Sequence, residues 1–433
     1  MVTQTRIESA LAFFTRKIIA KYRPMVIGIT GSVGKTSTRH AIAAAFSSKY
    51  HLREPEKNYN NQIGIPLTVI GAHGIDESTN WLSSQLGWLR IFVKALTVWL
   101  LPQKYPKLLV LEYGIDHAGD MDQLLDLVQP NIAVLTAIGT SHLENFTSQE
   151  HLAHEKGKIA SRLKQGEMFI YNGDDVLVTG QANELHNTTD ESKIAYSKNS
   201  ESTANIVLKS VTENLQLNPS TTLEIKTPTR EFKVTIPVVG TAHISAVLAA
   251  VAVCEGMELE TDLIVKGLRN YRAMPGRLNV IAGIKKTVLI DDTYNAAPLS
   301  TTEALKLLGK FPGEKKIAVL GDMLELGDGS ESAHLEVGQI VAGMNLQKLV
   351  TVGELGKIIA NGAHHNGMPA ENILNFENSD EAANKVLGML APESVILIKG
   401  SQGARMEKIT KELLAEPTAA TRLLVRQYGK WVE

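Results

Sequence analysis

Glycines, a lysine and hydroxyl side chains lie close together between residues 28 and 37, at spacings that suit a bound phosphate. The run Gly28-Ile29-Thr30-Gly31-Ser32-Val33-Gly34-Lys35-Thr36 follows an apolar, strand-like stretch and precedes a helical one. At such a junction the backbone N–H groups and the helix dipole can bind phosphate, and glycine lets the backbone approach closely. We expect a nucleotide site in which Lys35 neutralises the terminal phosphates and the Thr36 hydroxyl binds Mg²⁺. The other residues expected to contact the nucleotide in this loop are Gly31, Ser32, Gly34 and Ser37.

This loop is a variant of the general pattern, because the position of its first glycine is occupied by Ile29. A glycine-rich turn with an incidental Lys-Thr pair is the plainer alternative, but the strand–loop–helix context favours the phosphate loop. The loop alone does not distinguish a ligase from a switch or motor NTPase. Such an NTPase needs a strand-end aspartate for the metal and a positioned water or an arginine finger, whereas the next apolar strand, 108–111, ends in Glu112.

Short apolar strands alternate with helices on both sides of residue 275, which indicates parallel sheets with both faces covered. We therefore predict an α/β fold in three parts: an N-terminal amphipathic helix (1–24), a central P-loop domain with a parallel sheet (25–274), and a C-terminal Rossmann-like domain (275–433). A small β-rich region is expected at 193–238. Strands are predicted at 25–30, 108–113, 132–136, 168–171, 287–291, 317–320, 349–352 and 395–398, and helices at 35–48, 119–128, 148–164 and 242–257.

Composition limits the class of protein. The 433 residues are 44% hydrophobic and 21% charged, with a net charge of −2. The chain is therefore not built to coat nucleic acid or anionic lipid over its whole surface, and any such affinity must be local. The single cysteine, Cys254, lies in an apolar run and is expected in the core, which excludes an internal disulfide and a thiolate metal cage. The N-terminus shows no signal-peptide pattern, and no run reaches about 20 apolar residues, so we expect a cytoplasmic protein.

An ordered set of motifs from about residue 25 to 415 resembles the Mur ligase family, and within it the branch that adds D-alanyl-D-alanine to cell-wall precursors. The phosphate loop resembles the family's version, including the displaced first glycine. The other matching segments are Asn58–Thr68, Leu111–Gly114 with Gly119–Met121, Ser141–Glu144, Glu155–Ile159, Pro275–Leu278, Ile290–Pro298, Leu320–Gly327 and Lys399–Glu407.

The resemblance implies roles for individual residues. Glu112 and His142 would bind a second Mg²⁺ between the γ-phosphate of ATP and the substrate carboxylate, although His142 taken alone is more typical of a capping or core histidine. Lys156 resembles the family lysine that becomes carbamylated; a solvated helix lysine is the alternative. For His334, a surface histidine is the better interpretation. Nucleotide contacts from the C-terminal domain are implied for Arg277, Asp292, Tyr294 and Asn295, and substrate contacts for Asn60, Asn61, Lys399 and Arg405.

Two departures from the family pattern stand out. The segment Gly240–Ala246 occupies the place where family asparagines contact adenine, but it contains no asparagine, so His243 or Ser245 is expected to take over that contact. The phosphate loop also begins near residue 28. We therefore expect no room before the loop for the family's N-terminal domain, which holds the uridine nucleotide of the acceptor, and the identity of the acceptor stays open.

Two further helices are expected outside the motifs. Residues 5–23 form a basic amphipathic pattern. Within an insertion at 75–105, residues 81–101 are apolar and Trp-rich except for one stripe, Ser83, Gly87, Arg90, Lys94 and Thr97. The second helix is expected to be buried, to lie on a membrane surface or to bind a partner. A membrane span is disfavoured, because Arg90 and Lys94 would sit in mid-bilayer.

The most specific hypothesis is an ATP- and Mg²⁺-dependent ligase that forms an amide bond through an acyl phosphate, between a small-molecule cell-wall precursor and an amino acid or dipeptide. No nucleic-acid partner is expected, and peripheral membrane contact through 5–23 and 81–101 is a further expectation. The alternatives are a superfamily ligase acting on another, lipid-linked acceptor, folylpolyglutamate or cyanophycin synthesis, and a non-ligase NTPase. The Asn58–Thr68 and Asp291–Pro298 segments argue against the folylpolyglutamate type, and a second Rossmann-like domain argues against the NTPase.

Overall fold

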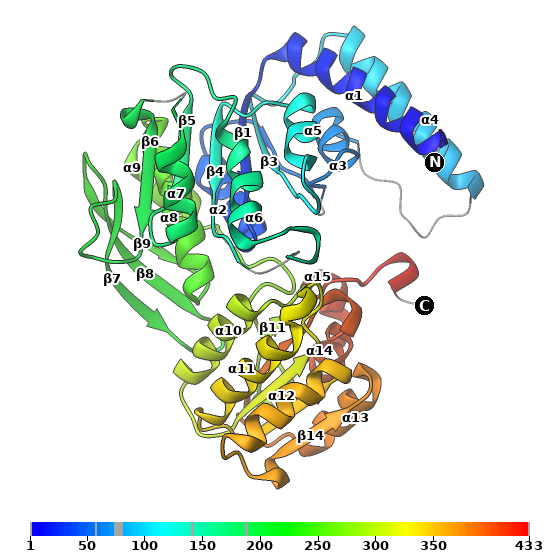
Figure 1. The fold of residues 1–433 in the computed structure, drawn as a ribbon, viewed down its shortest axis with the longest axis vertical. Coiled ribbons are helices and arrows are strands. Elements are labelled where there is room, and N and C mark those ends of the chain that lie inside the picture. Colours follow the sequence, from blue (N-terminus) through cyan, green and yellow to red (C-terminus); the bar gives the residue numbers. More distant parts are fainter. Residues whose placement is uncertain (1, 57–58, 73–80, 140–142, 187–188, 432–433) are drawn as a thin grey trace.

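Two separate β-sheets organise the chain in the computed structural model, which describes residues 2–56, 59–72, 81–139, 143–186 and 189–431. Figure 1 shows the first sheet and its helices above the second. Both are mixed sheets dominated by parallel pairs, which confirms the predicted α/β class.

The first sheet has the strand order β2-β3-β1-β4-β5-β6-β7-β8-β9, parallel as far as β7 and antiparallel from there to β9. Its central strands are continuous apolar runs, as expected where helices cover both faces. One face packs against α2, α8 and α9 and the other mainly against α1 and α3 to α7. The strands are β1 (Met25–Thr30), β2 (Leu52–Arg53), β3 (Leu108–Glu112), β4 (Ile132–Leu135), β5 (Met168–Asn172), β6 (Lys193–Ser197), β7 (Ile206–Asn214), β8 (Ser220–Lys226) and β9 (Glu231–Ile236). The helices are α1 (Val2–Tyr22), α2 (Lys35–Phe46), α3 (Gly64–Ile70), α4 (Trp81–Leu100), α5 (Asp120–Leu127), α6 (Gln149–Gly157), α7 (Val176–Glu184), α8 (Thr241–Gly256) and α9 (Thr261–Leu268).

The second sheet has the order β10-β11-β15-β12-β13-β14, and only β10 is antiparallel to its neighbour. Helices cover both of its faces. Its strands are β10 (Asn279–Ala282), β11 (Val288–Asp292), β12 (Lys316–Gly321), β13 (Lys348–Val352), β14 (Ile373–Phe376) and β15 (Val395–Lys399). Its helices are α10 (Pro298–Lys310), α11 (Ser330–Ala342), α12 (Glu354–His365), α13 (Ser379–Met389), α14 (Glu407–Leu413) and α15 (Ala420–Leu423).

The predicted strands are confirmed to within a residue at each end. Cys254 is confirmed as a core side chain. The helix predicted at 148–164 is shorter, because α6 ends at Gly157 and a 3₁₀ turn follows over Lys158–Ala160; glycine is a poor helix former. Strands β2, β10 and β14 were not predicted. They are short and only partly buried, so they lack a strong apolar pattern.

Strand order in the first sheet brings three strand ends together. β1 lies between β3 and β4, so the chain leaves β1 at a point where the sheet order reverses, and ligands bind at such points in α/β sheets. Thr30 ends β1, Glu112 ends β3, and Thr136 follows β4. In the second sheet, Asp292 of β11 and Lys399 of β15 are direct partners at the corresponding edge.

Candidate active site

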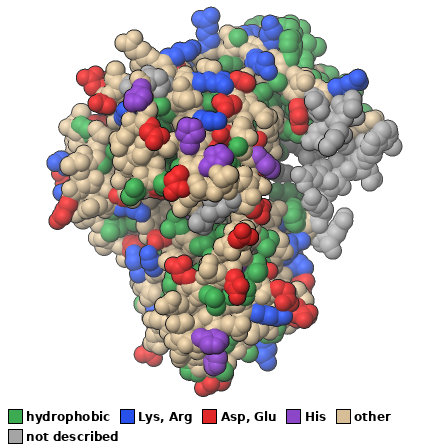
Figure 2. Space-filling view, viewed as in Figure 1, with side chains coloured by type: hydrophobic (Ala, Val, Ile, Leu, Met, Phe, Trp, Pro, Cys, Tyr) green, Lys and Arg blue, Asp and Glu red, His purple; other side chains and the backbone are tan. Residues whose placement is uncertain are grey.

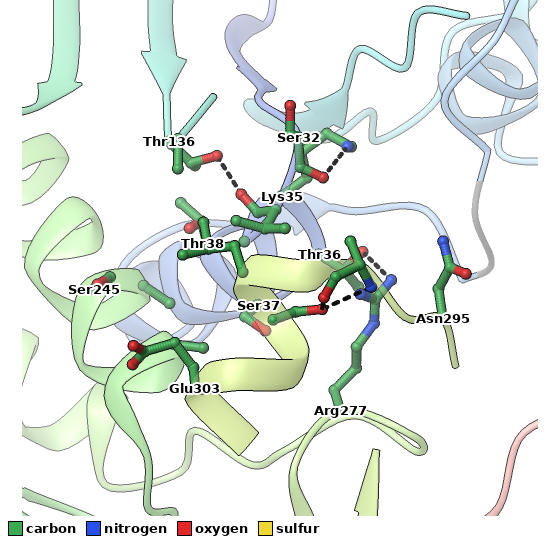
Figure 3. Close-up of a pocket in the computed structure, with 18 of the residues that line it drawn as sticks. Ser32, Lys35, Thr36, Ser37, Thr38, Thr136, Ser245, Arg277, Asn295 and Glu303 are labelled. Carbon is green, nitrogen blue, oxygen red and sulfur yellow. Dashed lines mark hydrogen bonds between the residues drawn. The ribbon is translucent and has the colours of Figure 1, made fainter. Parts of the chain in front are cut away.

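A cavity of about 800 Å³ lies between the carboxyl-end edges of the two sheets. Its walls come from both halves of the chain, because the phosphate loop lines one side and residues after β11 line the other. Figure 3 shows Arg277 of the second half directed toward Thr36 of α2. A space of this size suits a nucleotide with a second reactant.

The phosphate loop is held in shape from β4. The Thr136 hydroxyl donates to the Val33 carbonyl at 2.6 Å, and the Ser32 amide donates to the Ala137 carbonyl at 2.7 Å. Gly31 has a φ of +147°, and a Cβ there would lie 2.0 Å from the Thr136 hydroxyl oxygen. Glycine is therefore required at this position by space as well as by backbone conformation. The N–H groups at the start of α2 are left for a ligand, since no side chain caps this helix.

Lys35 lies at the bottom of the loop, where its Nζ donates to the Gly31 carbonyl at 2.6 Å. Burial lowers the pKa of this amine, and the nearby Glu112 carboxylate partly opposes that shift. Its charge is partly desolvated, so it interacts strongly with a neighbouring anion.

Glu112 and Thr36 form the described part of the candidate metal site. The Thr36 hydroxyl lies 3.3 Å from Oε2 of Glu112, while the other carboxylate oxygen is 3.3 Å from Nε of the buried Arg39. Arg39 also pairs with Glu54 at 3.1 Å. One hydroxyl and one carboxylate suit Mg²⁺, which keeps several waters and takes further oxygens from phosphates. No group of three or more His, Cys, Asp or Glu that could hold a metal occurs among the described residues, and His142 lies outside them.

Lys156 is not a solvated helix lysine. Its side chain is buried, and burial together with the charge of Lys35 lowers its pKa well below the usual value. A buried lysine with a lowered pKa is present as the neutral amine much more often than an exposed lysine is. Because strongly lowered pKa values cluster at functional sites, the burial of Lys156 beside Lys35 indicates that Lys156 has a functional role.

Arg277 links the two walls of the cavity. Its Nη2 lies 3.4 Å from the Thr36 hydroxyl, and its guanidinium stacks over the Tyr294 ring at 4.0 Å from the ring centre. Arg426 approaches the same ring at 5.6 Å and donates to the carbonyls of Thr293 and Tyr294. The C-terminal segment thereby holds the loop after β11 in place.

His243 takes part in a chain of hydrogen bonds at the wall of the cavity. Its Nε2 must donate to the Arg277 carbonyl at 3.1 Å, so its Nδ1 accepts from the Tyr271 hydroxyl at 2.7 Å, and Tyr271 accepts from Ser37. Burial lowers the pKa of this histidine to about 4, so the ring is neutral. Both ring nitrogens have partners, and His243 and Ser245 both line the cavity, so a contact of either residue with adenine stays a prediction.

Lys399 is buried and directed at Asp292, and its predicted contact with substrate stays a prediction. Its Nζ donates to Asp292 at 2.6 Å and to the Asn295 carbonyl at 2.9 Å. The second carboxylate oxygen of Asp292 accepts from the Leu278 amide at 3.1 Å. Asp292 and Lys399 therefore shape the loop that carries Asn295, and all three line the cavity.

Other candidates have structural partners. Arg405 does not line the described cavity: its guanidinium donates to Glu407 and to the Trp431 carbonyl, both at 2.6 Å. Asn60 and Asn61 both line the cavity; Asn61 accepts from the Gly64 amide at the start of α3 at 2.9 Å, and the Asn60 side chain packs against Gly114. The surface interpretation of His334 is wrong, because this ring is buried and accepts from the Met323 amide at 3.0 Å.

Several cavity residues were missed from the sequence. Thr136 could have been found from its place at a strand end. Tyr271 does not line the cavity but supports His243, and it could not have been found, because its bond to His243 joins residues on different elements. Others that line the far end of the cavity are Asn172, Asp175, Tyr196, Lys198, Leu299 and Glu303; Figure 3 shows Glu303 on the opposite side from Asn295.

Two family models match consecutive parts of the chain. The Mur ligase middle domain matches residues 91–254, and the Mur ligase, glutamate ligase domain matches residues 276–402. The first match begins after the phosphate loop and covers β3 to β9 of the first sheet, and the second covers all six strands of the second sheet.

Similar proteins of known name cover most of the chain. The UDP-N-acetylmuramoyl-tripeptide--D-alanyl-D-alanine ligase of Bacillus subtilis is 29% identical over 410 residues, which are 94% of this chain and 80% of that protein. The enzyme of the same name from Escherichia coli is 28% identical over 90% of this chain and 76% of its own length. Among solved structures, MurF from Acinetobacter baumannii has a TM-score of 0.76 at 24% identity, covering 94% of this chain and 81% of its own. MurF ligase from Thermotoga maritima in complex with ADP also has a TM-score of 0.76, at 22% identity, covering 96% and 84%.

Proposed function

The chain belongs to the Mur ligase family, and from that premise we propose that it joins the free carboxylate of a UDP-N-acetylmuramoyl-tripeptide to the amino group of D-alanyl-D-alanine. It is an ATP-dependent, ADP-forming ligase that uses Mg²⁺. The proposal of these two substrates rests on the relatives whose names specify them, since they match over nine-tenths of the chain.

One observation carries the reaction type. The phosphate loop and the residues after β11 form opposite walls of a single cavity, and they belong to different sheets. A hydrolase or switch needs only the first wall. A ligase must also hold a second reactant and keep water from an activated intermediate, which a site enclosed by two domains can do.

The bonds made and broken follow from this class of reaction. A carboxylate oxygen of the acceptor attacks the γ-phosphorus of ATP, and ADP leaves. The amino nitrogen of the dipeptide then attacks the carbonyl carbon of the acyl phosphate, inorganic phosphate leaves, and the nitrogen loses a proton. Both steps bring reactants together in a fixed orientation, so positioning supplies much of the rate.

Side chains of this protein reduce the repulsion between the two anionic reactants. Lys35 lies within the loop that would hold the phosphates, and Arg277 reaches the same place from the opposite wall. Thr36 would hold one Mg²⁺, and Glu112 with His142 would hold a second. When bound, the ions would supply further positive charge between phosphate and carboxylate. Charges fixed in advance in a partly dry site stabilise the transition state more than mobile ones in water do.

Lys156 suits the carbamylated position of the family pattern. Formation of a carbamate requires a neutral amine, which adds to carbon dioxide with loss of a proton, and burial beside Lys35 favours the neutral amine. The product would be an anion close to Lys35 and the metal site. We propose that this modified side chain supports the second metal ion.

For the place of action we propose peripheral contact with the inner face of a membrane. Among the helices in the described parts of the chain, none is long and apolar enough to cross a bilayer. We propose that the contact is made through the basic helix at 5–23 and the Trp-rich helix at 81–101.

Product formation tests the substrates directly. The full-length protein is incubated with ATP, Mg²⁺ and UDP-N-acetylmuramoyl-tripeptide, with and without D-alanyl-D-alanine, and both phosphate and the joined product are measured. Sustained phosphate release is expected only with both reactants present. Equal release from ATP alone would overturn the ligase assignment, whereas turnover only with another acceptor would overturn the named substrate.

A further inference from the structure

We propose that α1 and α4 form a docking surface for a bilayer that contains anionic phospholipid. The two helices pack side by side at one end of the first sheet, away from the second sheet, as Figure 1 shows. The proposal does not depend on the reaction that the cavity catalyses.

The packing of the two helices defines which side of α4 is left exposed. Its inner side buries Ile91, Ala95 and Val98. Between the helices, the Phe13 and Phe14 rings meet the Trp99 ring at 5.7 and 6.2 Å between centres. Lys21 of α1 donates to the Trp99 and Leu101 carbonyls at 2.7 and 2.8 Å, which caps the end of α4. The two helices therefore form one unit.

The outer side of α4 is apolar and exposed. Leu86, Leu89, Val93, Leu96 and Leu100 follow one another at intervals of three and four residues, and each is 43–59% exposed. Leu101 and Phe13 extend this stripe at its C-terminal end and toward α1. These seven account for nearly half of the fifteen large hydrophobic side chains exposed in the described parts of the chain. A continuous stripe of this kind marks an interaction surface.

The charge around the stripe indicates which kind of partner it binds. Residues 2–22 and 81–107 contain eight of the 44 Lys and Arg residues but only one of the 46 Asp and Glu residues. The rest of the chain has 36 basic and 45 acidic residues, so this end is basic whereas the remainder is acidic. Arg16, Lys17 and Arg90 are exposed, and the Lys17 Nζ lies 5.6 Å from the centre of the Phe13 ring. Figure 2 shows hydrophobic and basic side chains next to one another over this end of the molecule.

A lipid surface fits these features better than a second copy of the chain does. Two copies joined through this stripe would place net positive surfaces opposite each other. An anionic bilayer accepts leucine side chains below its headgroups while long basic side chains reach the phosphates. Each basic residue near such a surface contributes about 1 kcal/mol at low salt, and the attraction weakens as salt is added.

Sedimentation with vesicles tests the surface on the full-length protein. Wild type is expected to pellet with vesicles of phosphatidylcholine and phosphatidylglycerol in equal parts at low salt, less so at high salt, and weakly with phosphatidylcholine alone. Leu89→Ser/Val93→Ser/Leu96→Ser should abolish pelleting, and Lys17→Glu/Arg90→Glu should reduce it roughly tenfold or more, because two attractive charges become repulsive. The matched controls are Val211→Ser/Leu217→Ser and Lys385→Glu/Arg422→Glu, which alter exposed residues elsewhere.

Three results would overturn the proposal: wild type remaining in the supernatant with anionic vesicles at low salt, equal pelleting of the stripe variant, or a wild-type dimer that the stripe variant dissociates. Far-ultraviolet circular dichroism and the melting temperature show whether each variant is folded. All of the substituted residues lie outside the cavity, so ligase activity in solution should be unchanged in every variant.

Discussion

The two walls of the cavity are built in different ways. On the central-domain wall, the main contacts expected with a nucleotide come from one continuous segment, in which Lys35 and Thr36 directly follow the glycines. On the C-terminal wall, Asp292 is held by Lys399, 107 positions away, and the Tyr294 loop is held by Arg426. The nucleotide-binding groups of one wall therefore follow one another in the sequence, although hydrogen bonds from β4 hold their loop in shape. The other wall depends on a buried ion pair and on hydrogen bonds between distant segments.

This difference separates two kinds of effect. Groups on the central wall are expected to act on the reactants, so that their removal lowers turnover and leaves stability unchanged. Groups on the C-terminal wall support one another, so that their removal destabilises the domain as well. Arg277 belongs to both classes, because it reaches Thr36 while it stacks on Tyr294.

Lys35→Ala provides the largest contrast between the walls. We expect kcat to fall about a thousandfold or more, because the charge on the transferred phosphoryl group loses its partner, with little change in melting temperature. Phosphate release and thermal melting are measured together. The matched control is Lys266→Ala, an exposed lysine on α9. Near-normal turnover in Lys35→Ala would remove this residue from the phosphate site.

Lys399→Met should mainly lower stability, whereas Lys35→Ala should mainly lower turnover. It leaves the buried Asp292 carboxylate without its cation, which is expected to cost about 3–5 kcal/mol of stability, and turnover falls because the Asn295 loop loosens. Asp292→Asn/Lys399→Met removes both charges and should recover much of the loss. Additive losses in this double-mutant cycle would contradict the coupling between the two side chains.

The same contrast explains what could be predicted from the sequence. Strand positions and the phosphate loop were predicted well, because apolar runs and adjacent glycines are local patterns. Lys399 and Asp292 were both predicted at the site, but their pairing was not, because it depends on β11 and β15 being neighbours in the sheet. Helix α4 was predicted from its spacing, yet its sequence does not specify which side faces α1. His334 was misjudged because its burial depends on the Met323 backbone.

Glu112→Ala tests whether the central wall holds a metal. Removal of one ligand is expected to lower activity about 10- to 100-fold and to raise the Mg²⁺ concentration for half-maximal rate. Glu54→Gln is the control, because Glu54 shares the Arg39 partner but does not approach Thr36 in the described contacts. An identical Mg²⁺ titration for wild type and Glu112→Ala would exclude Glu112 as a ligand.

His243→Asn is expected to have the smallest effect, and it acts on the junction between the walls. The substitution interrupts the bonds from Ser37 through Tyr271 to the Arg277 carbonyl, so we expect a few-fold rise in KM for ATP at pH 7.5. A larger signature should appear in stability against pH. The pKa of the folded ring is about 4, below its ordinary value near 6.5, so the folded state binds fewer protons than the unfolded state between those values.

The stability linked to the neutral ring is therefore fully present above pH 6.5 and is lost as the pH falls through 4, by up to about 3 kcal/mol. Burial raises the pKa of Asp291 to about 7, which gives the opposite slope, but Asp291 is present in both proteins and cancels in their difference. The melting temperatures of wild type and His243→Asn are compared from pH 7.5 to pH 4.5. The wild-type advantage should shrink steadily below pH 6.5 and stay constant above it. An advantage that does not change across this range would mean that His243 is not held as the neutral bridge between Tyr271 and Arg277, and the two walls would then be joined by Arg277 alone.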